Sequence, residues 1–293
     1  MQPPKFSVIV PTYGRPRYLA DAIQSVLAQT VPDFECLVVD DASPEPVESP
    51  GDERVRVIRR ETNGGPAAAR NSGIDAARGD FVTFLDDDDL YAPDRLEIAR
   101  AGLERAPVAI CASRHLDAQE GRNRSLEGHV HDVILDDTTP HCGATAVRRE
   151  SILPFDEQFL ACEDVDWWLR TTRLHDVTTE ARVGVLIRRH DTPRHRIGTD
   201  ARLDGSLRLL EVHADYFASH RRARAFRWKR IGTLALQGGD RATARRAFAR
   251  SMVTVPHVRT AAGLARTLRP ASSRTEPTSS DPAGVGSEEP SSC

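Results

Sequence analysis

The sequence of 293 residues has no long apolar run. A helix that spans a membrane requires about 20 consecutive apolar residues, and no stretch of this chain approaches that length. The amino terminus reaches the strand-like run Phe6–Val10 directly, without the basic start, apolar segment and cleavage site of a signal peptide. We therefore expect the protein to stay in the cytoplasm, either free or held peripherally at the inner face of the cell membrane.

Cysteine is scarce and scattered. None of the five cysteines forms a CxxC pair. This spacing excludes a disulfide framework and argues against a structural zinc site, so we expect reduced thiols. The five positions are Cys36, Cys111, Cys142, Cys162 and Cys293.

The net charge is also low, at −3, which excludes a wholly basic nucleic-acid coat and a wholly acidic solvating chain. This total hides a separation of charge along the chain. Residues 1–220 carry 26 bases and 38 acids, whereas residues 221–269 carry 13 bases and one acid. Residues 270–293 carry one base and four acids and have almost no large apolar residue. We expect this last segment to be a disordered tail.

Strand-like and helix-like patterns alternate over the first 110 residues. Short apolar runs predict strands, and apolar residues at helical spacing predict the helices between them. Such alternation is typical of an α/β fold with a mostly parallel, doubly wound sheet, which binds ligands at the carboxyl ends of its strands. The predicted strands cover residues 6–10, 35–39, 55–58 and 80–85, and the predicted helices cover residues 16–30, 65–77 and 93–105. From about Gly205 the pattern is wholly helical.

Four consecutive aspartates, Asp86–Asp89, directly follow the predicted strand over residues 80–85. Their mutual repulsion is unfavourable unless a cation or hydrogen bonds offset it. Mg²⁺ and Mn²⁺ prefer carboxylate oxygens and commonly bridge a protein carboxylate to substrate phosphates. The alternative is an acidic surface turn that caps the next helix. Because the run lies at the carboxyl end of a strand, we favour a site for Mn²⁺ or Mg²⁺.

Three further segments contain residues suited to nucleotide binding. The segment Pro11-Thr12-Tyr13 ends the first predicted strand and offers an aromatic face to a base. Asp41 follows the second strand, where a carboxylate can accept hydrogen bonds from a base or ribose, although Asp is also a common turn former. In the segment Asn63–Gly73, small residues permit close approach and Arg70 can face a phosphate. This segment lacks the GxGxxG and GxxxxGK[ST] patterns, which disfavours Rossmann dinucleotide binding and P-loop hydrolysis.

These segments occur in the order and spacing of a known family. They are Ser7–Tyr13 (SVIVPTY), Val39–Ser43 (VDDAS), Asn63–Asn71 (NGGPAAARN), Phe84–Asp89 (FLDDDD), Phe155–Phe159 (FDEQF) and Glu163–Arg170 (EDVDWWLR). Together they resemble family 2 glycosyltransferases over roughly residues 5–200. The resemblance implies the GT-A nucleotide-diphospho-sugar transferase fold for residues 1–204, with a nucleotide-sugar half up to about residue 110 and an acceptor half after it. Residues 205–269 would be a basic helical extension.

The resemblance also implies a role for each candidate residue. Tyr13 and Asp41 would hold the nucleotide base, and Asp164 would be the general base that takes a proton from the acceptor hydroxyl. Mn²⁺ or Mg²⁺ would offset the growing charge of the leaving diphosphate. The implied substrate-binding residues are Pro11, Thr12, Tyr13, Asp41, Arg70, Asp86, Asp87, Glu163, Trp167 and Trp168, and the implied metal ligands are Asp88, Asp86 and His190.

Several of these residues also have a simpler structural interpretation. Asp164 and Asp166 would match the helix dipole at the start of a helix predicted over residues 163–174. Helix-borne tryptophans are common in protein cores, although we expect either Trp167 or Trp168 to face the acceptor sugar. His190 would be a solvated side chain in an arginine-rich loop.

The implied function is metal-dependent, inverting transfer of a sugar from a nucleotide-diphosphate donor to a hydroxyl acceptor, a saccharide or a lipid-linked glycan, in the synthesis of a surface polysaccharide or glycoconjugate. One alternative is a nucleotidyltransferase, whose glycine- and arginine/lysine-rich amino-terminal signature is absent. Another is a noncatalytic scaffold that binds partners through the C-terminal helices. The basic extension would attract an anionic membrane surface or form a solvated bundle paired with the acidic domain. It lacks an RNP-like aromatic pattern, so we expect no nucleic-acid partner.

Overall fold

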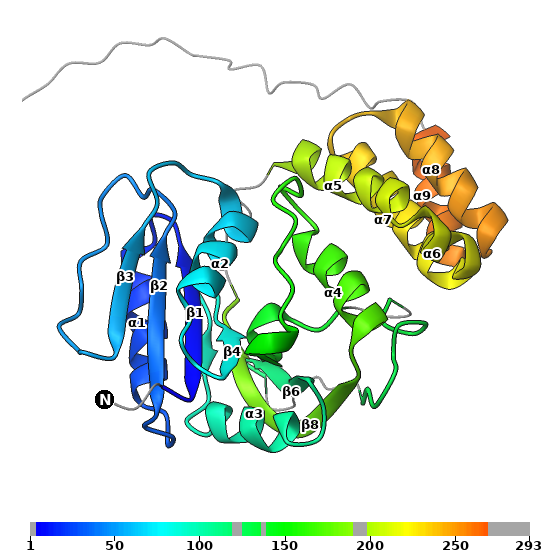
Figure 1. Ribbon diagram of the computed structural model, residues 1–293. Helices are drawn as coiled ribbons and strands as arrows, with labels where there is room; N and C mark the ends of the chain where they lie inside the picture. Colours follow the sequence, from blue (N-terminus) through cyan, green and yellow to red (C-terminus); the bar gives the residue numbers. More distant parts are fainter. Residues whose placement is uncertain (1–3, 119–124, 136–138, 190–197, 269–293) are drawn as a thin grey trace, which may run out of the picture.

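The computed structural model describes residues 4–118, 125–135, 139–189 and 198–268. In this part of the chain an eight-stranded sheet packs against helices and is followed by a helical extension (Figure 1). None of the helices in these ranges is long and apolar enough to cross a membrane. His190 and the predicted tail over residues 270–293 lie outside the described residues.

The first half of the sheet is parallel, as the alternating pattern predicts. Its strands are β1 (Phe6–Thr12), β2 (Phe34–Asp40), β3 (Val55–Arg59) and β4 (Phe81–Phe84). Every residue of β2 is buried, as expected for an apolar strand covered on both faces. The helices α1 (Pro16–Leu27) and α2 (Gly65–Ala76) make the crossover connections, and Pro16 occupies the first turn of α1, where its missing N–H is harmless.

The second half of the sheet is mixed, with the overall order β3-β2-β1-β4-β7-β6-β8-β5. It contains β5 (Leu90–Tyr91), β6 (Val108–His115), β7 (Thr145–Arg148) and β8 (Val177–Ile187), with α3 (Arg95–Leu103) and α4 (Glu163–Leu174) as its helices. Strand β7 runs antiparallel to both β4 and β6, and β5 runs antiparallel to β8. The prediction of a mostly parallel sheet is therefore accurate for the first half and too simple for the second.

The carboxyl ends of β1, β2 and β4 meet at one edge of the sheet. Thr12 pairs in register with Asp40, and Ile9 pairs with Phe84. The residues that follow these strands are consequently neighbours in space, although they are far apart in the sequence. This edge therefore collects the segments that the sequence analysis selected.

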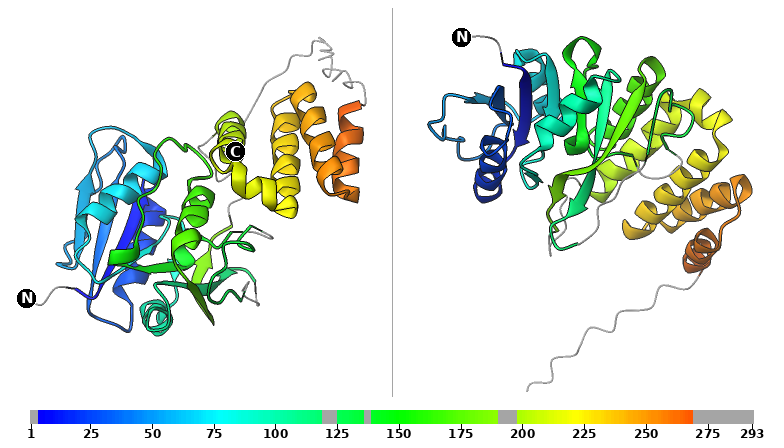
Figure 2. Two further views of the ribbon diagram at one scale, coloured as in Figure 1. Left: turned by 45° about the vertical axis from the view of Figure 1, so that its right-hand side comes forward. Right: turned by 90° about the horizontal axis from the view of Figure 1, so that it is seen from below.

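The helical extension packs directly onto the acceptor half. It consists of α5 (Thr199–Val212), α6 (Ala214–Ser219), α7 (Arg221–Gln237), α8 (Arg241–Thr254) and α9 (Val258–Leu268). Leu209, Tyr216 and Phe217 are buried in the same core as the sheet, and a Cβ added at Gly205 would collide with the carbonyl oxygen of Ala161. Figure 2 shows the yellow helices of the extension next to the green acceptor half and the orange helices α8 and α9 farther out. The predicted boundary at residue 204 falls inside α5, which already begins at Thr199.

Candidate active site

A pocket of about 770 Å³ opens at the carboxyl ends of the first strands. This volume is in the usual range for small-molecule sites, roughly 300–1,000 Å³. The first half contributes Pro11, Thr12, Tyr13, Asp41, Arg70, Asp86, Asp87 and Asp88, the second half contributes His141, Cys142, Glu163 and Asp164, and the extension contributes Arg202, Phe226, Arg227 and Arg230. The pocket thus unites most of the predicted site residues with a wall from the extension that sequence reasoning did not anticipate.

Asp41 lies on the pocket wall, held by the turn that begins α2. Its carboxylate accepts hydrogen bonds from the backbone N–H groups of Gly64 (3.0 Å) and Gly65 (2.8 Å). It also pairs with Nε of Arg60 at 2.8 Å. The next residue, Ala42, has a φ of 60°, a left-handed conformation that non-glycine residues rarely adopt. Asp41 is therefore a fixed part of the wall.

Asp87 and Asp88 tie the aspartate run to the end of β1. The Thr12 hydroxyl donates to Oδ2 of Asp87 at 2.7 Å. Nη1 of Arg15 lies 3.0 Å from a carboxylate oxygen of each aspartate. Burial raises the pKa of Asp87. These contacts order the loop that carries the four aspartates.

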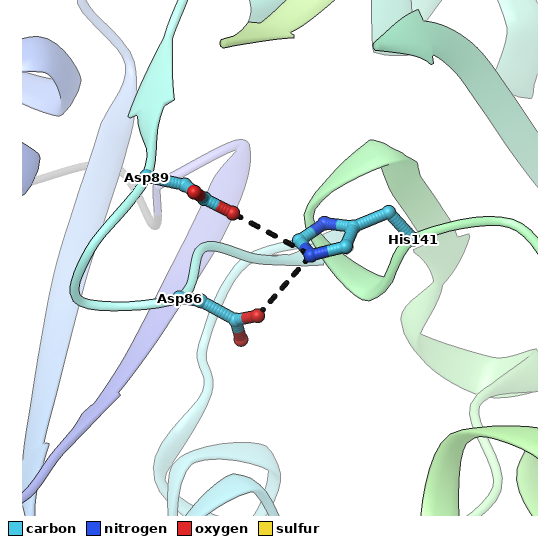
Figure 3. Close-up of side chains that lie close together, drawn as sticks. All are labelled: Asp86, Asp89 and His141. Carbon is cyan, nitrogen blue, oxygen red and sulfur yellow. Dashed lines mark ion pairs between the residues drawn. The ribbon is translucent and has the colours of Figure 1, made fainter. Parts of the chain in front are cut away.

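Asp86, Asp89 and His141 converge as candidate metal ligands (Figure 3). Nε2 of His141 lies 3.3 Å from Oδ2 of Asp86 and 3.4 Å from Oδ2 of Asp89. Asp86 is a predicted ligand, whereas Asp89 and His141 have no individual role predicted from the sequence. Asp88, predicted as a direct ligand, is not in this group and instead pairs with Arg15.

The chemistry of this group fits a divalent cation. Its three donor atoms lie within 4.8 Å of one another, and a set of two carboxylates and one imidazole suits Mn²⁺. Burial alone would raise the pKa of Asp86, but hydrogen bonds and charges from His141 and Arg70 hold that pKa well below its ordinary range. Asp86 is therefore ionised, as a metal ligand must be.

Arg70 is a buried link between the two halves of the site. Its Nη1 donates to Oε1 of Glu163 at 2.9 Å, and its Nη2 donates to Oδ1 of Asp86 at 3.0 Å. Burial, and then the charge of Asp164, raises the pKa of Glu163 to about 7. Arg70 lowers the pKa of Glu163 but offsets the rise only in part, because the same guanidinium also pairs with Asp86. Arg70 lines the pocket as predicted, but its two carboxylate partners already neutralise it.

Asp164 is half-buried on the pocket wall at the start of α4. Its Oδ1 accepts a hydrogen bond from the backbone N–H of Val165 at 2.8 Å. Cys162, at the N-cap, has a φ of 67°. In the described ranges, the two non-glycine residues with positive φ are Cys162 and Ala42. Cys162 directly precedes Glu163, and Ala42 directly follows Asp41. Strained backbone of this kind is concentrated at functional sites.

The predicted sugar-stacking role of Trp167 and Trp168 is wrong. The two side chains are 1% and 0% exposed, and their indole N–H groups donate to the carbonyl oxygens of Leu153 and Pro140. Both rings belong to the hydrophobic core of the sheet, where Trp167 stacks on Phe155 and meets Trp168 edge to face. Phe226 of α7, which is 39% exposed, is the aromatic ring of the extension that does line the pocket.

The mixed sheet, with acidic residues at the carboxyl ends of its strands, defines the GT-A class of fold, as predicted. The structure of S. aureus TarS residues 1–349 in complex with UDP-GlcNAc matches with a TM-score of 0.62 at 20% identity, over 89% of this chain and 84% of that chain. The mannosyltransferase PcManGT from Pyrobaculum calidifontis, in complex with GDP-Man and Mn²⁺, matches with a TM-score of 0.55 at 20% identity, over 91% of this chain and 80% of that chain. At these identities the likeness shows the fold alone.

The family model for glycosyl transferase family 2 matches residues 7–157, which is just over half of the chain. The chain therefore belongs to glycosyl transferase family 2. Succinoglycan biosynthesis protein ExoW of Rhizobium meliloti is 46% identical over 110 residues, 34% of this chain and 34% of that relative. The putative teichuronic acid biosynthesis glycosyltransferase TuaG of Bacillus subtilis is 33% identical over 159 residues, 50% of this chain and 63% of that relative. The chain spans less than two thirds of the length of each of these curated relatives.

Proposed function

We propose that the protein is a metal-dependent, inverting glycosyltransferase. It moves a sugar from a nucleotide-diphosphate donor to a hydroxyl acceptor. The observation that carries this proposal is one pocket whose lining includes Tyr13 and Asp41, Asp86 and His141, and Asp164. Its volume of about 770 Å³ has room for a nucleotide-diphosphate sugar and part of an acceptor.

The names of similar proteins support this donor and this setting. The matching structures hold UDP-GlcNAc in TarS and GDP-Man with Mn²⁺ in PcManGT. ExoW and TuaG are named for the biosynthesis of succinoglycan and teichuronic acid. We infer that the acceptor is a saccharide or a lipid-linked glycan and that the product is a surface polysaccharide or glycoconjugate. The expected location is the cytoplasm, with the protein either free or held at the inner face of the cell membrane.

Asp164 is the proposed general base. It lines the pocket, where it is half-buried, and lies in the first turn of α4. As the acceptor oxygen forms its bond to the anomeric carbon, the bond from that carbon to the diphosphate oxygen breaks. The acceptor proton passes to Asp164, and the nucleoside diphosphate leaves. Attack from the side opposite the leaving group inverts the configuration.

The other residues of the pocket position the donor. Tyr13 offers a ring to the base, and Asp41 is held rigidly beside it by the turn before α2. Asp86, Asp89 and His141 would hold Mn²⁺ or Mg²⁺, which when bound would neutralise the charge that develops on the leaving diphosphate. Glu163 and Arg70 keep the first turn of α4 next to the aspartate loop. Asp87 and Thr12 support that loop from β1.

The two alternative functions receive less support. A nucleotidyltransferase would need its own amino-terminal signature, which is absent from the strand ending in Tyr13. A scaffold that acts through the extension would present those helices to partners. Instead, α5 and α7 contribute five residues to the pocket lining, which makes them part of the site.

The test is nucleotide binding followed by turnover. UDP and GDP should each be titrated against the full chain with Mn²⁺, and the better nucleotide should raise the thermal unfolding temperature. Asp164→Asn should preserve this binding and remove release of nucleoside diphosphate from the matching sugar donor. Asp75→Asn, at an exposed position on α2, is the control. Failure of both nucleotides to bind, or full turnover by Asp164→Asn, would refute the proposal.

A further inference from the structure

Three arginines of the extension line the pocket. They are Arg202 of α5 and Arg227 and Arg230 of α7. Arg227 is only 4% exposed. Within the described ranges, none of the three forms an ion pair with a carboxylate. Arg70, which is equally buried, pairs with two carboxylates.

This arrangement is unfavourable unless an anion completes it. A buried charge is normally paired, because removal from water is costly. Nη1 of Arg227 makes a weak contact with the sulfur of Cys162, at 3.9 Å. In the described residues, the Nε atoms of Arg227 and Arg230 are buried without a hydrogen-bond partner. Burial lowers the pKa of Arg202 and of Arg227, and the charge of Arg230 lowers both further. The charge of Arg230 thus disfavours the charged form of both neighbouring arginines, and the charge of Asp164 offsets this only in part at Arg227.

The arginines lie on the acceptor side of the pocket. Arg227 contacts Cys162, which precedes the proposed base Asp164 by two residues, and Cys162 also contacts Ser206 of α5. Figure 1 shows α7 beyond α4, on the side away from β1, β2 and β3, and the left view of Figure 2 agrees. An anion at the arginines would therefore belong to the molecule whose hydroxyl faces Asp164.

We propose that Arg202, Arg227 and Arg230 bind an oxyanion, a phosphate or a carboxylate, that the acceptor carries. This assignment to the acceptor rests on the proposed function. Planar guanidinium groups bind both oxyanions with paired hydrogen bonds. The exposed ring of Phe226 lies in the same wall and can pack against the apolar face of a sugar. Part of the basic charge of the extension thus has a role inside the site.

Titration calorimetry on the full chain tests this site, with inorganic phosphate, glucuronate and glucose as probes. Phosphate or glucuronate should bind, and the tighter of the two identifies the class of acceptor group, whereas neutral glucose should not bind measurably. The double variant Arg202→Gln/Arg230→Gln should weaken oxyanion binding about tenfold or more, because it removes two charge-assisted contacts. It leaves buried Arg227 in place, so folding is preserved.

Two controls separate this site from general charge and from structure. Arg222→Gln changes an exposed arginine at the start of α7 and should leave the affinity unchanged. The double variant should unfold at the same or a higher temperature than the wild type without ligand, because it relieves repulsion between cations. A structural role for the two arginines would produce the opposite shift. An equal loss of affinity in both variants would overturn the site.

A third arm distinguishes the acceptor from the donor diphosphate. The oxyanion titration is repeated with saturating UDP and Mn²⁺, and binding at the arginines should persist. Displacement of the oxyanion by UDP would overturn the assignment to the acceptor, as would unchanged affinity in the double variant or no oxyanion binding by the wild type. UDP or GDP binding with Mn²⁺ is read separately, so its failure contradicts the proposed function and not the arginine site.

Discussion

Arg70 and Glu163 form a buried ion pair that joins α2 to α4, with 2.9 Å between Nη1 and Oε1. The same guanidinium lies 3.0 Å from Asp86. Because removal of one partner leaves a buried charge uncompensated, we expect Arg70→Ala to lower the free energy of unfolding by about 3–5 kcal/mol. Urea unfolding at neutral pH measures this change.

Two further variants isolate the ion pair from the loss of an arginine in general. Arg70→Lys keeps the charge but loses the fork that reaches both carboxylates, so it should be intermediate. Arg100→Ala, at an exposed position on α3, should change the free energy of unfolding by less than about 0.5 kcal/mol. If Arg70→Ala were no more destabilising than Arg100→Ala, the pair would not hold the two halves together.

His141 is the residue whose removal tests the metal group most directly. If Asp86, Asp89 and His141 hold a cation, His141→Ala should weaken Mn²⁺ binding in the presence of UDP by about tenfold or more. The alternative is that no cation binds here and that a protonated His141 forms ion pairs with Asp86 and Asp89. In that case the Mn²⁺ affinity would not fall. Calorimetry distinguishes the two, with His175→Ala on the far end of α4 as the control.

Asp88 and Asp89 provide a second test of the same group. The resemblance to family 2 glycosyltransferases predicts Asp88 as a ligand, whereas the geometry places Asp89 beside His141 and pairs Asp88 with Arg15. We expect Asp89→Asn to weaken Mn²⁺ binding more than Asp88→Asn does. The reverse order would show that the loop rearranges when it binds the ion and that the family motif is the better guide.

The sequence predicts the positions of the helices and strands around the site better than the direction in which the strands run. Helix α4 has the predicted bounds, Glu163–Leu174, because its acidic start and apolar spacing are local signals. Strand β7 is only four residues long, and a short apolar run carries no information on strand direction. Its antiparallel pairing depends on contacts that form only when the second half closes onto β4.

The site residues that the sequence did not predict are brought into the site by the same long-range contacts. His141 comes from a segment with little periodic pattern, and its role arises only when it lies against Asp86 and Asp89. Arg227 appears in the sequence as one of many bases, and nothing local distinguishes an arginine that faces the pocket from one that faces solvent. The fold makes that distinction, because α7 brings Arg227 to Cys162 at the start of α4.

Trp168 tests the corrected interpretation of α4. The side chain is fully buried, so Trp168→Ala should lower the free energy of unfolding by about 3–5 kcal/mol. Trp168→Phe should lower it less, because the ring is partly replaced. Leu174→Ala, at a 64% exposed position on the same helix, is the control and should be nearly neutral. Urea unfolding gives all three values, and a neutral Trp168→Ala would restore the idea of a pocket-facing ring.

Asp166 links α4 to the extension, and its ionisation should make the free energy of unfolding depend on pH. Its Oδ1 lies 2.9 Å from Nε2 of His213, and its Oδ2 pairs with Arg170. Burial alone would raise the pKa of Asp166, but these partners outweigh burial and hold the pKa below its ordinary value. A carboxyl with a lowered folded-state pKa stabilises the protein above its unfolded pKa of about 3.9, and this contribution is lost as the pH falls through the folded value.

Asp166→Asn should therefore be less stable than the wild type at pH 7, by about 1.5–3 kcal/mol for charged hydrogen bonds. The difference between the two proteins should shrink as the pH falls below about 4, because the wild-type carboxyl then becomes protonated as well. Urea unfolding at a series of pH values between 7 and 3 measures this convergence. Asp75→Asn, at an exposed site on α2, should track the wild type throughout. A difference for Asp166→Asn that stays constant with pH would mean that the ionised carboxylate does not hold the extension against α4.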